Sequence, residues 1–173
     1  MLSGESVFRV VFLNFIFMLM WHIATFVICR CLSRPFFNPE KFLYNQKKWE
    51  NNGSFYVNIL KIKRWKDYLP QFVSKNGFSK RSLKKNSELC YEYINMFIVE
   101  TCRAEWNHIV CCFYFTFSFF VNSFFYGLIF SLVPIIANLP FIAIQRYNRI
   151  RLRRLCVRYK PNPENMVRLG ETV

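Results

Sequence analysis

The stretch IVCCFYFTFSFFVNSFFYGLIFSLVPIIANLPFIAI, residues 109–144, contains no charged side chain over 36 residues. One helix of this length would extend about 54 Å, although the hydrocarbon core of a bilayer is only about 30 Å thick. Asn122, Ser123 and Gly127 near its middle are residues that favour a turn. The stretch therefore predicts two short spans, about 109–122 and 127–145, with a re-entrant hairpin as the alternative.

A second uncharged run covers residues 10–29, and its 20 residues are enough to cross the same core as one helix. Arg9 precedes this run and Arg30 follows it. A cleaved signal peptide would have a shorter apolar region and small residues at a cleavage site. The run therefore predicts a retained N-terminal signal anchor.

The composition combines many apolar residues with a large positive charge. The 173 residues, expected to form one membrane domain (1–173), are 53% hydrophobic and yet carry a net charge of +14. Apolar spans with basic flanks reconcile the two values. A nucleic-acid-binding protein would not need the long uncharged runs, so no nucleic acid is expected as a partner. The seven cysteines lack CxxC spacing and favour neither a disulfide framework nor a metal site.

The basic residues decide between the topologies. Residues 41–85 carry a net charge of +10, the tail 146–173 carries +6, and residues 1–9 are neutral. A hairpin returns both basic segments to the cytoplasmic side, where Lys and Arg concentrate. The sequence thus predicts an all-α integral membrane protein. It would have one N-terminal signal-anchor span, a C-terminal membrane hairpin and, between them, a basic, mostly helical cytoplasmic region at about 30–108.

Local signals divide this cytoplasmic region. Asn-Pro-Glu at 38–40 predicts the start of a helix that runs to Asn52. Residues 55–64 fit a short strand or an interfacial helix about equally well, and residues 74–86 are expected to form an exposed basic loop. A long helix is expected to begin near Ser87 and to run unbroken into the second span.

The densest polar group is ETCRAEWNH, residues 100–108, where this long helix enters the membrane. A histidine held by a carboxylate near a bilayer surface could be a general base that deprotonates a sugar hydroxyl for attack on an acyl thioester. The alternative is an ion pair between Glu100 and Arg103, with His108 as an interfacial cap. The candidate catalytic residues are Glu100, Arg103, Glu105 and His108.

A second polar group, NLPFIAIQRYNRIR, occupies residues 138–151 at the end of the last span. Asn138 lies inside the span, where a polar side chain is costly unless it faces protein or a water-filled cavity. Guanidinium groups suit phosphates, so acyl-CoA or the phosphopantetheine of an acyl-carrier protein could dock at the cytoplasmic exit. The alternative is a positive-inside signal that contacts anionic lipid. The candidate substrate-binding residues here are Asn138, Gln145, Arg146, Asn148, Arg149 and Arg151.

A third candidate group for substrate binding is Trp65, Lys66 and Asp67. Lys66 could hold a phosphate or carboxylate, and Asp67 could orient a sugar hydroxyl. The alternative is an interfacial anchor, because aromatic rings and cations gather in the headgroup zone. The chain has no His-x4-Asp pair, no Gly-x-Ser-x-Gly, no P-loop and no dinucleotide fingerprint.

The motifs at 62–67, 100–108 and 136–152 together resemble the glycosyl-4,4′-diaponeurosporenoate acyltransferase family. These small bacterial membrane enzymes complete staphyloxanthin-type carotenoids. The resemblance implies transfer of a fatty acyl group from an acyl thioester to a sugar hydroxyl of a glycosylated carotenoid acid, with a related glycolipid as the alternative acceptor. It implies no cofactor apart from acyl-CoA or acyl-carrier protein as co-substrate. A hypothesis of another class is a noncatalytic membrane protein that binds anionic lipid or a membrane enzyme partner.

Overall fold

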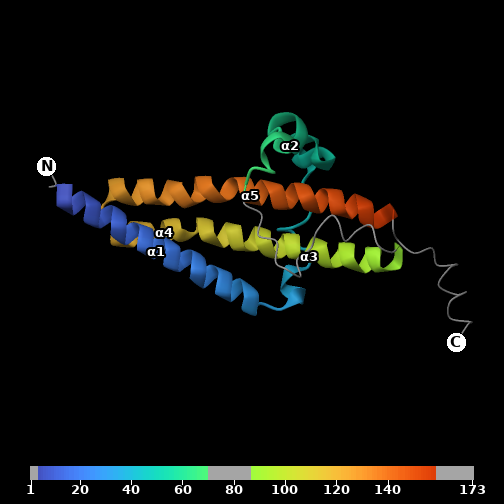
Figure 1. Cartoon of the computed structure of the whole chain (residues 1–173), viewed down its shortest axis with the longest axis horizontal. Helices are drawn as coiled ribbons and strands as arrows, with labels where there is room; N and C mark the ends of the chain where they lie inside the picture. The colour runs from blue at the N-terminus through green and yellow to red at the C-terminus, as the bar shows by residue number, and fades with distance from the viewer. Residues whose placement is uncertain (1–3, 70–86, 159–173) are drawn as a thin grey trace, which may run out of the picture. The chain divides into compact units, whose positions relative to one another are not determined.

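The computed structural model describes residues 4–69 and 87–158, and these residues form helices joined by turns and short irregular segments, with no strand among them (Figure 1). The helical character of the prediction is therefore confirmed. The basic loop expected at 74–86 and the tail beyond residue 158 lie outside the described residues. In chain order the elements are α1 (Gly4–Cys31), η1 (Arg34–Phe37), η2 (Lys48–Gly53), η3 (Phe55–Ile59), α2 (Ile62–Trp65), α3 (Ser87–Cys112), α4 (Tyr114–Val121) and α5 (Phe124–Arg158).

The chain divides into two compact units. Unit 1 comprises Met1–Phe36 and Arg103–Gln145, and unit 2 comprises Phe37–Cys102 and Arg146–Val173. Unit 1 therefore contains α1, most of η1, the end of α3, α4 and the first part of α5. Unit 2 contains η2, η3, α2 and the remaining parts of α3 and α5.

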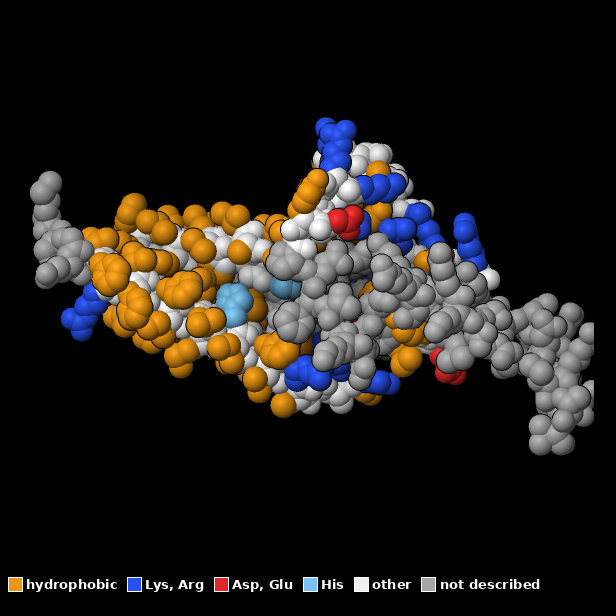
Figure 2. Space-filling view, viewed as in Figure 1, with side chains coloured by type: hydrophobic (Ala, Val, Ile, Leu, Met, Phe, Trp, Pro, Cys, Tyr) orange, Lys and Arg blue, Asp and Glu red, His pale blue; other side chains and the backbone are white. Residues whose placement is uncertain are grey.

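Helix α1 turns polar side chains into unit 1 and apolar side chains outward. Asn14, Thr25 and Cys29 are buried, whereas Phe8 is 72% exposed and Met20 is 60% exposed. The helices of a soluble bundle show the opposite distribution. Figure 2 shows that hydrophobic side chains cover most of the visible face of this unit.

Helix α5 follows the same pattern in unit 1. Gly127, Ser131, Pro134 and Asn138, spaced three or four residues apart, are buried on one face, while Ile136 on another face is 64% exposed. Small and polar residues at helix interfaces are typical of membrane bundles, in which the lipid takes the apolar side chains.

Two helical segments, Ser6–Cys31 and Phe124–Arg158, are long and apolar enough to cross a membrane. Only 11% and 28% of their most apolar windows are buried, so neither resembles the covered core helix of a soluble protein. Length, composition and outward apolar faces together indicate a transmembrane protein.

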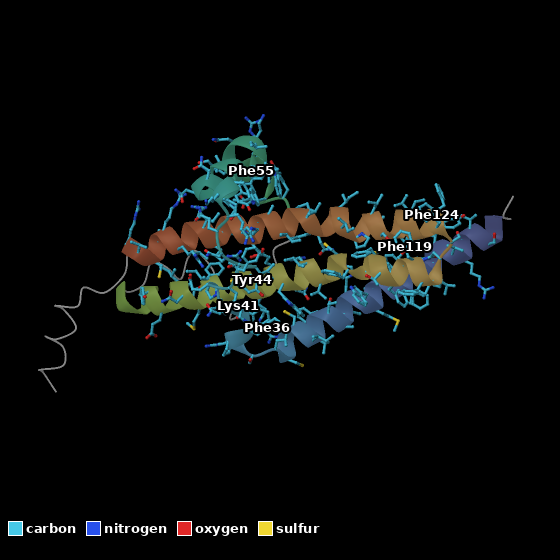
Figure 3. All side chains as sticks on the ribbon, turned by 180° about the vertical axis from the view of Figure 1, so that it is seen from behind. Phe36, Lys41, Tyr44, Phe55, Phe119 and Phe124 are labelled. Carbon is cyan, nitrogen blue, oxygen red and sulfur yellow. The ribbon has the colours of Figure 1, made fainter. Side chains whose placement is uncertain are left out.

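The predicted turn in the long apolar stretch is confirmed at Asn122 and Ser123, between α4 and α5. Phe119 and Phe124 flank it (Figure 3), with ring centroids 6.1 Å apart. The side chain of Asn122 exchanges two hydrogen bonds with that of Asn14 on α1, at 2.7 and 2.8 Å, so the turn is tied to the first helix.

The sequence predicted that the long helix α3, which begins at Ser87, runs unbroken into the second span. The structure shows instead that α3 ends at Cys112, near the start of that span. The interruption lies at Phe113, whose N–H donates to the carbonyl of Val110, three residues earlier, rather than to that of residue 109. Thr116 repeats this tighter bond to Phe113, so a short 3₁₀-like step separates α3 from α4.

The prediction of a helix from residue 38 to Asn52 is wrong. The Asn38 side chain instead accepts a hydrogen bond from the Glu40 N–H at 2.9 Å, and the chain is irregular up to the 3₁₀ helix η2. Within η2, Asn51 and Asn52 have φ values of 40° and 53°, and Gly53 has a φ of 86°. Asparagine and glycine tolerate this left-handed backbone, which ends the segment.

Unit 2 has a small apolar core between α3 and the second part of α5. Ile94 and Ile98 of α3 are buried together with Leu152 of α5. Residues 55–64, for which strand and helix were both open, are helical: they form the π-helical turn η3 (Phe55–Ile59) and most of the short helix α2 (Ile62–Trp65).

The charge distribution predicts that the C-terminal tail is cytoplasmic and that the turn at Asn122 lies on the opposite side. A green fluorescent protein fused to the C-terminus should fluoresce in cells, because it does not fold after export in an unfolded state. Alkaline phosphatase fused after Val121 should be active, because it needs the oxidising exterior. The opposite pattern of the two reporters would contradict the topology.

Candidate functional site

His108 of α3 lies inside unit 1 against α5. Its Nδ1 is 2.8 Å from Oδ1 of Asn138, and its ring stacks on Phe141 with centroids 4.9 Å apart and an interplanar angle of 10°. Phe141 is one turn of α5 beyond Asn138, so a single helix supplies both the polar and the apolar contact. These two contacts fix the position and the plane of the imidazole.

The amide of Asn138 is fixed in turn by its own helix. Its Nδ2 donates to the carbonyl of Pro134 at 2.8 Å. A rotated amide would place two acceptors together there, so Oδ1 must face His108. Because Oδ1 can only accept, the proton of neutral His108 is on Nδ1 and the lone pair is on Nε2. This is the tautomer that a general base with Nε2 as its basic atom requires.

His22 of α1 completes a polar row that we define as His22, Asn138 and His108. Nε2 of His22 is 3.5 Å from Nδ2 of Asn138, and Nδ1 of His22 is 2.8 Å from the carbonyl of Met18. His22 was not among the site residues predicted from the sequence. The sequence does contain one indication: His22 is a titratable residue inside an apolar span. Such a residue costs free energy in the membrane and is commonly functional.

The other predicted catalytic residues have different surroundings. Glu105 is only 1% exposed, but the amide of Asn138, rather than a carboxylate, holds Nδ1 of His108. The backbone carbonyl of Arg103 accepts a hydrogen bond from the Cys29 thiol at 3.5 Å, and Glu100 belongs to unit 2. Of the predicted residues, the structure thus brings His108 and Asn138 into one group.

Unit 2 is built around a buried ion pair between Arg146 of α5 and Glu50 of η2. Nε and Nη2 of Arg146 lie 2.8 and 3.0 Å from the two carboxylate oxygens, and the Tyr56 hydroxyl donates to Oε1 at 2.5 Å. Arg146 also donates to the carbonyls of Leu43 and Asn45. All three guanidinium nitrogens are therefore used within the fold.

Protonation of this cluster follows from its contacts. Burial alone raises the pKa of Glu50, but hydrogen bonds from Arg146, Tyr56 and the Lys47 backbone outweigh it, so the pKa of the carboxyl is lowered from its usual value. Burial and the hydrogen bond to Glu50 both raise the pKa of the Tyr56 hydroxyl, which stays protonated. The cluster therefore consists of an ionised Glu50 carboxylate that accepts hydrogen bonds from the charged Arg146 and from the neutral Tyr56 hydroxyl.

The arginines of α5 divide into two sets by helix face. The inward arginines are Arg146, Arg149 and Arg153: Arg149 donates to the Tyr44 carbonyl at 3.0 Å, and Arg153 donates to the Pro39 carbonyl at 2.7 Å. They have a structural role, which the interpretation of Arg146 and Arg149 as phosphate ligands did not foresee.

The outward arginines, all exposed, are Arg151, Arg154 and Arg158. Arg151 lies over the ring of Tyr147 at 5.6 Å. Gln145 and Asn148 are half-buried.

In the third predicted group, Trp65 and Lys66 bind to residues close to them in the sequence. The indole N–H of Trp65 donates to the Leu60 carbonyl at 2.7 Å, and the buried Lys66 ammonium pairs with the neighbouring Asp67 carboxylate at 2.7 Å. The Asp67 side chain is 67% exposed, so its carboxylate remains accessible to a ligand.

Within the described part of the chain, no three His, Cys, Asp or Glu side chains are arranged to hold a metal ion. The chemistry that these residues can perform is acid–base catalysis by His108, whose Nε2 has no hydrogen-bond partner there. The fold and this site define a class: a small helical membrane protein with an oriented imidazole among its apolar helices.

Comparison with known proteins then identifies the family. Residues 39–158 match the family model of glycosyl-4,4′-diaponeurosporenoate acyltransferase. A protein of that name from Staphylococcus haemolyticus (strain JCSC1435) is 31% identical over 129 residues, which cover 73% of this chain and 72% of the relative. No solved structure matches the chain. The chain belongs to the glycosyl-4,4′-diaponeurosporenoate acyltransferase family, as the sequence motifs indicated, and so to staphyloxanthin-type carotenoid biosynthesis.

The Glu50–Arg146 pair generates a stability prediction. Because folding lowers the pKa of Glu50, its contribution is complete above the usual carboxyl pKa and is lost as the pH falls through the lowered value. Glu50→Gln should reduce the free energy of unfolding by about 3 kcal/mol at neutral pH, because it leaves Arg146 buried without its anion. Thermal unfolding in detergent, measured from neutral pH to well below the usual carboxyl pKa, should show that the difference in stability between this variant and the wild type shrinks in acid.

The matched control is Glu40→Gln. Glu40 also pairs with an arginine of α5, Arg153 at 3.0 Å, but its side chain is 74% exposed. An exposed pair contributes less than about 1 kcal/mol. Equal losses in the two variants would show that burial does not give the Glu50 pair its importance.

Proposed function

We propose that this protein transfers a fatty acyl group from an acyl thioester to a sugar hydroxyl of a glycosylated carotenoid acid. Membership of the family supports the acyltransferase class and a glycolipid acceptor. The observation that carries the residue assignment is the contact between His108 and Asn138, because it leaves the basic Nε2 of an oriented imidazole unprotonated. Apolar surroundings suit a carotenoid acceptor that is dissolved in the bilayer.

In the proposed step His108 is the general base. Its Nε2 takes the proton of the sugar hydroxyl while the hydroxyl oxygen forms a bond to the thioester carbonyl carbon. The carbon–sulfur bond then breaks, and the leaving thiolate receives the proton from the imidazolium. The products are an ester and a free thiol, and His108 returns to its neutral state.

The donor is assigned to the outward face of α5 beyond the span. Asn148, Arg151 and Arg154 follow one another at three-residue intervals and are therefore neighbours on the helix surface. Arg151 and Arg154 are exposed and make no hydrogen bond or ion pair with the described residues. Guanidinium groups bind phosphate through paired hydrogen bonds, and both acyl-CoA and an acyl-carrier protein present phosphate beside the thioester.

Removal of the base tests the proposed step. Cells that make the glycosylated carotenoid acid and express the wild-type protein should accumulate its acylated product, as read by mass spectrometry of their lipids. His108→Ala should lower the rate of product formation at least about a hundredfold, the usual contribution of a general base. Trp106→Phe, on the same helix, is the matched control, because its ring packs on Phe36 outside the polar row.

The outcomes separate the hypotheses. Full activity of His108→Ala at the wild-type protein level would show that the base assignment is wrong. Acylation of a different glycolipid by the wild-type protein would show that this glycolipid, rather than the glycosylated carotenoid acid, is the acceptor. A wild-type protein that acylates no lipid and consumes no thioester would instead support a noncatalytic membrane partner.

Removal of the outward arginines tests the donor assignment. The double variant Arg151→Ala and Arg154→Ala should raise the KM for the thioester donor about tenfold or more, because charge-assisted hydrogen bonds contribute about 1.5–3 kcal/mol each. The KM for the carotenoid should not change. Arg9→Ala removes one positive charge from α1 and should leave both KM values unchanged. A double variant with the wild-type donor KM in low salt would contradict the assignment.

A further inference from the structure

His22 is a polar residue in the first span, and it lies outside residues 39–158, which the family model matches. The structure nevertheless places it in the polar row beside Asn138. We propose that His22 is a positioning residue for catalysis, which acts on His108 through the amide of Asn138. This inference rests on the proposed role of His108 as the base.

The hydrogen bonds of the row all run in one direction. His108 Nδ1–H donates to Oδ1 of Asn138, Nδ2–H of Asn138 donates to Nε2 of His22, and Nδ1–H of His22 donates to the Met18 carbonyl. The backbone carbonyl at the end can only accept, so it fixes the tautomer of His22 and leaves its Nε2 as an acceptor. This polarity requires Nε2 of His22 to accept, and it is kept when Nε2 of His108 takes a proton, because Nδ1–H of His108 donates in both states.

This direction has a consequence when His108 takes a proton. The Nδ1–H of an imidazolium is a stronger donor, and bonds aligned head to tail strengthen one another. The row then stabilises the positive charge that appears on His108 in the transition state. His22 should therefore act on kcat and not on the binding of either substrate.

Complete use of the Asn138 amide supports the same role. One of its N–H groups donates to Pro134 at 2.8 Å, the other lies 3.5 Å from His22, and its oxygen accepts from His108. Loss of His22 leaves one N–H without a partner among apolar helices, which favours other orientations of the amide. The distance of 3.5 Å is long for a hydrogen bond, so the effect should be smaller than the loss of His108 itself.

Helix α1 does not depend on His22 for its attachment to unit 1. Asn14 exchanges two hydrogen bonds with Asn122, and the indole N–H of Trp21 donates to the Val110 carbonyl at 3.2 Å. Two further polar contacts thus tie α1 to the turn after α4 and to α3, both from residues that precede His22. A purely structural role for His22 would be largely redundant, and variants at this position should fold.

The test compares purified variants in detergent with an acyl thioester and the glycosylated carotenoid acid. His22→Leu should lower kcat about ten- to a hundredfold, the usual effect of removing a group that orients a functional residue, with both KM values unchanged. His22→Gln, whose side-chain oxygen can accept from Asn138, should recover part of the loss. Thr25→Val is the control: Thr25 lies one turn further along the buried face of α1 and contacts Cys111.

A double variant shows whether His22 acts through Asn138. If it does, His22→Leu combined with Asn138→Ala should have the same kcat as Asn138→Ala alone. If the double variant instead lowers kcat by the product of the two single effects, the proposal is overturned. A wild-type kcat for His22→Leu would also overturn it. The apparent Tm of each variant checks the fold, and His22→Met replaces the leucine variant if that one is not recovered.

The proposed function can fail separately. A wild-type kcat for His22→Leu together with an inactive His108→Ala overturns only the role of His22. Activity in both variants overturns the base assignment and with it this inference.

Discussion

A polar group that is buried without water must find its partner inside the protein, and this constraint shapes both units. In unit 1 it is met between side chains of different helices, by the Asn14–Asn122 pair and by the row His22, Asn138 and His108. In unit 2 it is met between side chains and backbone, where arginines of α5 bind carbonyls of residues 39–45. These carbonyls have no helical partners because the segment is not a helix.

The choice of an amide to orient His108 has a physical advantage in apolar surroundings. A carboxylate in the place of Asn138 would bury a charge at a cost of several kcal/mol unless it were paired. Asn138 offers the same accepting atom without charge, and the Pro134 carbonyl fixes its orientation. The polar row can therefore lie among apolar helices and remain neutral until a proton arrives. Family membership supplies the class of reaction, and the row supplies an atom that can begin it.

Features that depend on neighbouring residues could be read from the sequence. The apolar runs and the turn at Asn122 followed from local patterns, and so did the selection of His108 and Asn138 as candidates. Features that depend on distant residues could not. The segment expected to form a helix from residue 38 to Asn52 instead contacts Arg146, 96 positions from Glu50, and no local pattern shows this contact. The pairing of His108 with Asn138 rather than with a nearby carboxylate depends on the packing of two helices, as does the place of His22.

The buried pair of Glu50 and Arg146 also limits how this protein can change over evolutionary time. A single substitution at either position leaves a charge without its counterion in the interior of unit 2. A joint replacement by apolar residues of similar volume is much better tolerated. The two positions are therefore expected to drift together in related sequences. Such paired drift would identify distant members that share this architecture even where their catalytic motifs have diverged.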